Sequence, residues 1–166
     1  MKTIMKISGV ISPVLLAVGA LFKINHWAGA GIFIGLGFIL LCLLFLPSAI
    51  YVLYSENKGK RFFLYLFGFL SFLPLMAGIF FKVQHWPAAG ILLTVGFIIT
   101  ILLFLPTLLY VKIKDSERKD LNPVFTVGVI AGMIHLAGLF FKLMHWPGSS
   151  LLFFVGPVLF VLVFIP

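Results

Sequence analysis

Six long apolar stretches account for most of this chain of 166 residues, and short polar segments separate them. A hydrocarbon core about 30 Å thick requires roughly 20 helical residues to cross it. Because that core offers no water to the backbone, apolar stretches of this length are expected to be helices rather than strands. The sequence therefore predicts an all-α membrane protein with six transmembrane helices. They are expected approximately at residues 7–26, 30–53, 62–82, 88–111, 122–143 and 148–166.

The composition excludes an ordinary soluble domain. Apolar residues make up 63% of the chain and charged residues 10%, against roughly 45–50% and about 25% in soluble domains. The net charge of +8 does not indicate a nucleic-acid partner, because the basic residues are spread over short loops and form no continuous face. We therefore expect the lipid bilayer to be the main partner of the chain. The single cysteine, Cys42, allows no intrachain disulfide.

The motif Gly-x-x-Phe-Lys-x-x-His-Trp occurs three times, near the ends of the first, third and fifth apolar stretches. It spans residues 19–27, 78–86 and 138–146, so that its histidines stand 59 and 60 residues apart. A Gly-Phe or Gly-Pro pair and a Phe-x-Pro element repeat with the same spacing, at residues 37–38, 96–97 and 156–157 and at residues 45–47, 104–106 and 164–166. The sequence therefore predicts three tandem helical-hairpin repeats. Their boundaries are expected at residues 1–56, 57–115 and 116–166.

Two features concern the ends of the chain. Residues 1–6 are basic, residues 7–16 are apolar and residues 18–20 are small, which is also the pattern of a secretory signal peptide. Cleavage there would cut through the first copy of the motif, so we expect this segment to remain as the first helix. The third Phe-x-Pro element ends the sequence where the earlier copies go on to a charged loop. We therefore expect the full-length protein to continue after Pro166.

Prolines are expected to shape several helices. A proline inside a helix removes an amide donor and crowds the preceding turn. Bends are therefore expected at Pro13, Pro47, Pro74 and Pro106, with those near Pro47 and Pro106 at equivalent positions of two hairpins. Asn122 followed by Pro123 is typical of a helix start, in which the asparagine side chain caps free amides.

The motif permits two interpretations. Its five residues fall on or beside one broad helix face. In the first interpretation they form an interfacial anchor: the lysine snorkels, the tryptophan lies among head groups, the histidine caps the helix and the glycine permits close packing. In the second, lysine and histidine point into the bundle to bind an anion, relay protons or accept a partner's carboxylate. We expect at least one of the lysines to face a pocket with its neighbouring histidine.

These interpretations define the candidate site residues. The candidate functional face comprises Lys23, His26, Trp27, Lys82, His85, Trp86, Lys142, His145 and Trp146. The candidate packing residues are Gly19, Gly78 and Gly138.

Acidic residues are confined to the two charged loops, where Glu56, Asp115, Glu117 and Asp120 lie. No carboxylate of the chain is therefore expected near the motif lysines. If the three lysines converge in a pseudo-threefold bundle, then lipid phosphates, a bound anion, another subunit's acid or loss of a proton must neutralise them.

Nothing in the sequence indicates catalysis. We find no nucleophile beside a base, phosphate-binding loop, zinc spacing or paired carboxylates, and we expect no enzymatic activity, no cofactor and no metal site. His135, which only the third hairpin carries, lies about 280° around the helix from His145 at roughly 100° per residue. That separation argues against a metal or haem site shared by these two histidines.

Each turn resembles the N-terminal transmembrane hairpin of GldL, the gliding motility and type IX secretion motor protein family. The resemblance rests on Gly-x-Leu/Phe-Phe-Lys-x-x-His-Trp-Pro-Gly/Ala, is best in the third copy (FFKLMHWPGSS) and recurs in all three hairpins. It implies a family in which one hairpin per subunit, with both ends cytoplasmic, forms a ring around helices of a partner, GldM, and couples proton flow to rotation. The sequence departs from that family in joining three hairpins and in having no acid in the second, fourth or sixth apolar stretch, where the family carries a glutamate.

Basic residues indicate the orientation in the membrane. Nine of them lie on one side of the predicted bundle, at Lys2, Lys6, Lys58, Lys60, Arg61, Lys112, Lys114, Arg118 and Lys119, and three lie on the other, at Lys23, Lys82 and Lys142. The positive-inside rule places the nine in the cytoplasm. We therefore expect a multi-pass protein of the bacterial inner membrane with both ends cytoplasmic.

The sequence thus favours a non-enzymatic membrane module that acts as an anchor, sensor or assembly unit for a cytoplasmic region or partner. A membrane-protein partner or self-association is expected. The alternative is a transporter or an ion- or proton-conducting subunit that uses the lysine–histidine faces.

Overall fold

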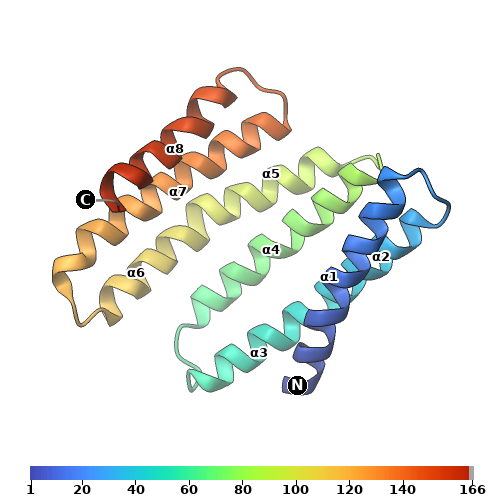
Figure 1. The fold of residues 1–166 in the computed structure, drawn as a ribbon. Coiled ribbons are helices and arrows are strands. Elements are labelled where there is room, and N and C mark those ends of the chain that lie inside the picture. The colour runs from blue at the N-terminus through green and yellow to red at the C-terminus, as the bar shows by residue number, and fades with distance from the viewer. Residues whose placement is uncertain (165–166) are drawn as a thin grey trace.

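Three antiparallel helical hairpins stand side by side in the computed structural model, which describes residues 1–164 (Figure 1). The first hairpin comprises α1 (Lys2–Ile24), α2 (Ala30–Ile39), η1 (Leu40–Phe45) and α3 (Leu46–Glu56). The second comprises α4 (Phe62–Val83), α5 (Ala89–Ile99), η2 (Thr100–Phe104) and α6 (Leu105–Asp115). A short η3 (Lys119–Leu121) leads into the third, α7 (Asn122–Leu143) and α8 (Ser149–Phe164).

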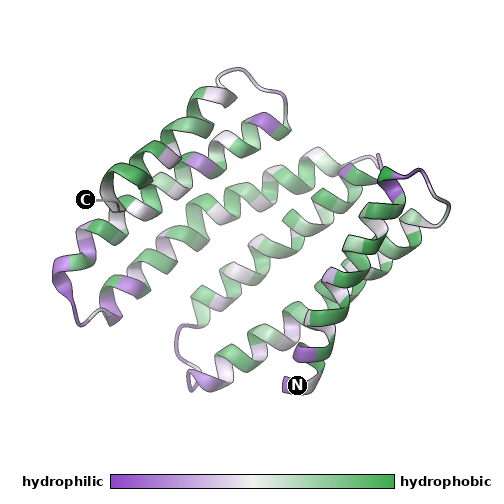
Figure 2. Cartoon of the chain, viewed as in Figure 1, coloured by the Kyte–Doolittle hydropathy of each residue, from purple (hydrophilic) through white to green (hydrophobic). Residues whose placement is uncertain are grey.

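The prediction of an all-α membrane protein is confirmed. Five helical segments of the described chain are long and apolar enough to cross a bilayer, and two of them run continuously through α2 to α3 and through α5 to α6. The sixth, α8, has 16 described residues. Hydropathy colouring shows apolar helix bodies, with most polar residues near the helix ends and in the loops (Figure 2).

Two prolines coincide with a local change of helix type. The π-helical segments η1 and η2 lie immediately before Pro47 and Pro106, at equivalent positions of the first two hairpins. Proline lacks an amide donor and its ring crowds the carbonyl four residues earlier, and a π turn removes that conflict by shifting the hydrogen-bonding partners. Pro13 and Pro74 lie inside α1 and α4, which are α-helical over their whole length. The Phe-x-Pro element of the third hairpin extends to residues 165–166, outside the described residues.

Glycines bring the two arms of each hairpin together. A Cβ atom added at Gly19, Gly78 or Gly138 would lie 2.8, 2.8 or 2.4 Å from a backbone nitrogen of the opposite arm, at Ile34, Leu93 or Phe153 respectively. These distances leave no room for a side chain, so the arms touch backbone to backbone as small residues permit in membranes.

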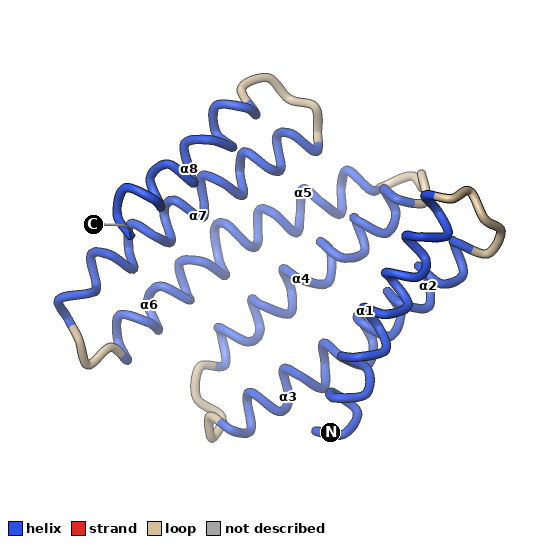
Figure 3. Tube along the Cα trace, in the orientation of Figure 1, coloured by secondary structure: helices blue, strands red, loops and turns tan. Residues whose placement is uncertain are grey.

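Neighbouring hairpins pack against each other less extensively than the two arms of one hairpin do. The second arm of one hairpin packs on the first helix of the next, and the packing includes the ring pairs Phe38–Phe80 and Phe97–Phe140, with centroids 5.2 and 5.1 Å apart. Phe97 and Phe140 also belong to a buried cluster with Leu93. The first and third hairpins lie at opposite ends of the row (Figures 1 and 3). The described chain is therefore an open row of hairpins rather than a closed pseudo-threefold bundle.

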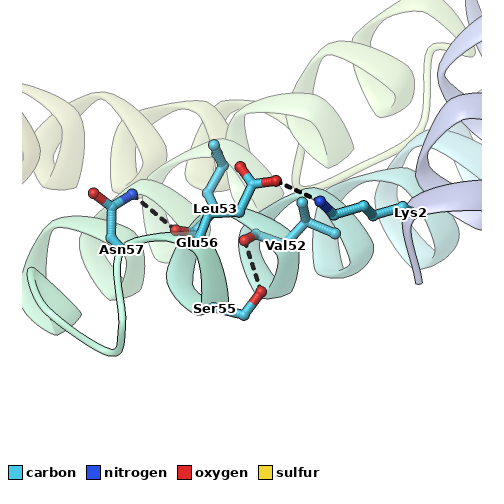
Figure 4. Close-up of polar contacts among 6 residues, drawn as sticks. All are labelled: Lys2, Val52, Leu53, Ser55, Glu56 and Asn57. Carbon is cyan, nitrogen blue, oxygen red and sulfur yellow. Dashed lines mark hydrogen bonds and ion pairs between the residues drawn. The ribbon is translucent and has the colours of Figure 1, made fainter.

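Ion pairs place the N-terminus and both charged loops at one end of the row. Lys2 Nζ lies 2.8 Å from Glu56 Oε1, joining the start of α1 to the end of α3 (Figure 4). Arg61 Nη2 lies 2.5 Å from Asp115 Oδ2, joining the start of α4 to the end of α6. The three turns that carry His-Trp lie at the opposite end.

The expected cap at Asn122 is wrong. Asn122 is the first residue of α7 and makes no side-chain cap hydrogen bond, and Leu121 occupies the N-cap position. The Asn122 side-chain oxygen is buried without a described donor. Pro123 does lie in the first turn, where its missing N–H costs no helical hydrogen bond.

Candidate functional site

The three copies of the motif form the same structure at the ends of α1, α4 and α7. In the first copy, His26 N–H donates to the Lys23 carbonyl at 3.2 Å and Trp27 N–H donates to the Phe22 carbonyl at 2.8 Å. The second and third copies repeat both backbone bonds. The histidine N–H lies 3.2 and 3.3 Å from the lysine carbonyl oxygen, and the tryptophan N–H lies 2.8 Å from the phenylalanine carbonyl oxygen in both copies. This pair of bonds is the Schellman ending of an α-helix, which satisfies carbonyls that the last turn leaves free.

The phenylalanine and tryptophan side chains of the motif pack against each other at this helix end. Their ring centroids lie 5.1, 5.2 and 5.1 Å apart in the three copies, with interplanar angles of 85°, 74° and 74°. A hydrophobic contact between these two positions commonly accompanies a Schellman ending. The five-residue spacing from phenylalanine to tryptophan is therefore a requirement of the turn itself. The tryptophans also stay 59, 50 and 44% exposed, in order along the chain.

The motif histidines occupy a backbone position that usually belongs to glycine. His26, His85 and His145 have φ values of +54°, +56° and +57°. A residue with a Cβ atom adopts this left-handed conformation at some cost in free energy, although histidine tolerates it better than most. All three side chains are exposed. The imidazoles are therefore free to contact head groups, water or another protein.

The motif lysines reach across to the neighbouring hairpin. Lys23 Nζ donates to the backbone carbonyl of Val83, the last residue of α4, and Lys82 Nζ donates to that of Leu143, the last residue of α7. A helix C-terminus carries free carbonyls and partial negative charge, which suits a cation. Each of these lysines thus provides the C-terminal charge partner for the first helix of the next hairpin. Both are half-buried.

The third lysine has a different environment. Lys142 is exposed, and its Nζ lies 4.8 Å from the ring centroid of Phe153 in its own hairpin. Within the described chain no hairpin follows the third, so no further helix end lies next to Lys142. Lys142 is thus exposed among the described residues, where Lys23 and Lys82 are half-buried.

Comparison with known protein families identifies the chain. A family model described as the GldL N-terminal domain matches residues 10–63 and 74–124, which together make up more than half of the sequence. The chain belongs to the GldL N-terminal domain family. The two matched segments contain the first and second copies of the motif, and the third copy lies outside them. No curated protein and no solved structure matches the chain.

The third hairpin of this GldL-family chain has a polar contact between its two arms that the other two lack. His135 Nδ1 lies 3.0 Å from the carbonyl oxygen of Phe153. That carbonyl would ordinarily accept the N–H of residue 157, but Pro157 has none. Because a carbonyl oxygen can only accept, His135 Nδ1–H supplies the missing donor. At the positions of His135 and Pro157, the first two hairpins have Leu16 with Phe38 and Leu75 with Phe97. These hairpins need no such bond, because phenylalanine, unlike proline, has a backbone N–H.

The structure offers little for metal or substrate chemistry around the motif. Among residues 1–164, no three histidine, cysteine, aspartate or glutamate residues lie close enough together to hold a metal ion. A groove of about 920 Å³ opens at the charged end, far from the His-Trp turns, and Lys60, Arg61 and Lys114 are among its lining residues. The motif residues take no part in it.

Proposed function

We propose that the protein is a non-enzymatic membrane module in which three GldL-like hairpins form a preassembled row that anchors a cytoplasmic region or holds a partner in the membrane. Membership of the GldL N-terminal domain family supports a membrane role, and the apolar helices support bilayer contact. The basic residues gathered at the end that holds the N-terminus support an inner-membrane location with both ends cytoplasmic.

One observation carries this proposal. Lys23 and Lys82, which are the cations that a transport pathway would need, are used to join hairpins. A lysine held on a neighbouring helix end stabilises the contact between two hairpins, because its charge suits the helix C-terminus and its hydrogen bond joins the helices. Moving it during a transport cycle would separate the two hairpins that it joins. The motif thus supports an assembly role better than a conducting one.

Proton passage by the mechanism that the resemblance implies has no carboxylate to use. The four acidic residues lie in the two charged loops or at the helix ends beside them, and the two helical segments that run through η1 and η2 contain none within their apolar part. We propose on this basis that the chain supports assembly without conducting protons itself.

Ion flux in proteoliposomes tests the proposal. The purified full-length protein is reconstituted, a proton or potassium gradient is imposed, and flux is followed with a pH-sensitive dye. We expect flux equal to that of empty liposomes, both for the wild type and for Lys82→Leu. Flux above that background that Lys82→Leu abolishes would overturn the proposal in favour of a conducting subunit. Correct insertion is checked in the same vesicles by protease protection of the charged loops.

A further inference from the structure

The two arms of the second hairpin separate toward the charged end of the row. Near the His-Trp turn they touch backbone to backbone at Gly78, whereas a Cβ added at Gly68 would meet only the side chain of Phe104, at 3.2 Å. Pro106 lies in the first turn of α6, which diverges from α4 toward the charged end (Figure 1). The groove of about 920 Å³ occupies this opening, and residues of both helices and of the loop before α4 line it. Its volume lies within the range of roughly 300–1,000 Å³ that is typical of ligand pockets.

The groove has one basic end and one apolar end. Lys60 and Arg61, immediately before α4, and Lys114, in the last turn of α6, line it where the helices leave the apolar region. Phe67 and Pro106 line it further along the two helices. From Lys114 to Pro106 the groove follows α6 for about 12 Å, at 1.5 Å per residue. An occupant of the whole groove must therefore carry negative charge at one end and apolar surface at the other.

The basic end carries more positive charge than the protein itself neutralises. Arg61 is paired with Asp115, whose Oδ2 lies 2.5 Å from Arg61 Nη2. Among residues 1–164, Lys60 and Lys114 form no ion pair, and Lys114 Nζ lies 5.9 Å from the ring centroid of Tyr110. Helix α4 also begins there without a side-chain cap and without an acidic residue in its first turn. A negatively charged group therefore suits both the unpaired lysines and the free amides of that helix start.

The first hairpin keeps the ion pair but not the basic end. Lys2 and Glu56 stand where Arg61 and Asp115 stand, and their side chains form the equivalent ion pair. The other equivalent residues are uncharged or smaller: Met1 for Lys60, Ser55 for Lys114, Ser8 for Phe67 and Ser48 for Thr107. Ser8 and Ser48 are 4 and 1% exposed, so the arms of the first hairpin lie close together there. The second hairpin thus has two more lysines and an open groove at the same place in the repeat.

We propose that this groove binds the head group and part of an acyl chain of an anionic phospholipid. The phosphate lies between Lys60 and Lys114, and the chain lies along Phe67 and Pro106 toward the bilayer interior. The bilayer is the source of the occupant, because a soluble phosphate compound would leave the apolar end of the groove unfilled. Basic pockets between transmembrane helices recognise anionic head groups by the same charge complementarity. The site does not depend on the proposed assembly role, because it requires only that the charged end lies at a membrane surface.

Lipid binding to the purified full-length protein tests this site. The protein in neutral detergent is titrated with phosphatidylglycerol, and native mass spectrometry gives the fraction with bound lipid. Lys60→Gln combined with Lys114→Gln removes both unpaired charges and retains most of the side-chain length. Lys58→Gln combined with Lys119→Gln is the matched control, because it removes the same charge from exposed residues at the same end and neither residue lines the groove.

The wild type is expected to retain one phosphatidylglycerol and to bind phosphatidylcholine, whose head group has no net charge, more weakly. The groove variant should weaken phosphatidylglycerol binding by at least about tenfold and the control by less than about twofold, because salt at 0.15 M largely screens charges beyond about 8 Å. Thr107→Phe places a ring in the apolar end of the groove and leaves the net charge unchanged. It should also lower phosphatidylglycerol binding, by excluding the acyl chain.

Four results would overturn the site. They are equal losses in the groove and control variants, equal binding of the two lipids, binding that Thr107→Phe leaves unchanged, and displacement of the lipid by millimolar inorganic phosphate, which would indicate a site for a soluble anion. Thermal unfolding in lipid-free detergent shows whether each variant folds, and Thr107→Phe decides the outcome if the lysine variant does not. Ion flux is a separate measurement. A chain that binds the lipid but conducts loses the proposed function and keeps this site.

Discussion

His135 and Phe153 form a hydrogen bond between the two arms of the third hairpin, with Nδ1 3.0 Å from the carbonyl oxygen. The bond exists because Pro157, four residues after Phe153, cannot supply the usual helical donor. His135 therefore compensates for the N–H that Pro157 lacks. Neither occurs at the equivalent positions of the first two hairpins.

A double-mutant cycle tests this dependence. His135→Leu alone is expected to lower the free energy of unfolding by about 1–2 kcal/mol, because it leaves a carbonyl without a donor in an apolar environment. In a Pro157→Phe background the same change should cost less than about 0.5 kcal/mol, since the backbone at position 157 would then supply the helical N–H. Thermal unfolding in detergent, followed by circular dichroism, gives both values. Equal costs in the two backgrounds would show that the two residues are independent.

Glycine at the motif start is predicted to be essential for packing within each hairpin. Gly78→Ala places a Cβ 2.8 Å from the backbone nitrogen of Leu93, which cannot move aside without displacing its helix. We expect a loss of about 1–3 kcal/mol. Gly132→Ala is the matched control, because a Cβ there meets nothing within 4 Å. It should be neutral or slightly stabilising, as alanine favours helix over glycine. Similar losses for both variants would contradict the close-packing account.

The left-handed backbone of the motif histidines is expected to cost stability that glycine would restore. His85→Gly is expected to raise the free energy of unfolding by about 0.5–1 kcal/mol, because glycine adopts φ near +56° without a Cβ penalty. His85→Val should lower it, since a β-branched residue fits this region poorly. Thermal unfolding of both variants gives the comparison. If His85→Gly is destabilising, the imidazole itself contributes to the fold.

Single cysteines report the orientation in the membrane. In a Cys42→Ser background, cysteine at position 28 should react with an impermeant thiol reagent added to the outside of intact cells. Cysteines at positions 57 and 116 should react only after the membrane is opened, because the positive-inside rule places both charged loops in the cytoplasm. Outside labelling at 57 or 116 would exclude this orientation.

The helices could be predicted closely from the sequence, because bilayer thickness sets their length. The second and fourth were expected at residues 30–53 and 88–111, and the structure extends them to Glu56 and Asp115. The extra turns are polar, and apolar patterning gives no signal for helix beyond the hydrocarbon boundary. The π-helical turns before Pro47 and Pro106 were anticipated only as bends, since a proline does not specify how its helix adapts.

The site was less accessible to sequence reasoning. The partner of Lys23 is a backbone carbonyl, which every residue possesses, so no pattern of side chains could indicate it. Two signals were present and could have been used. The five-residue spacing from Phe22 to Trp27 is that of the hydrophobic contact in a Schellman ending. The joint change to His135 and Pro157 within one repeat indicated that the two residues depend on each other, here through the Phe153 carbonyl.

The most direct test of the account compares leucine substitutions at the three motif lysines in the monomeric protein in detergent. Lys23→Leu and Lys82→Leu should each lower the free energy of unfolding by about 1–2 kcal/mol, because each removes a charged donor from the end of a neighbouring helix. Lys142→Leu should leave it unchanged within about 0.5 kcal/mol, because Lys142 joins no neighbouring hairpin within the chain. Equal effects at all three positions, or the largest effect at Lys142, would contradict the claim that these lysines join successive hairpins.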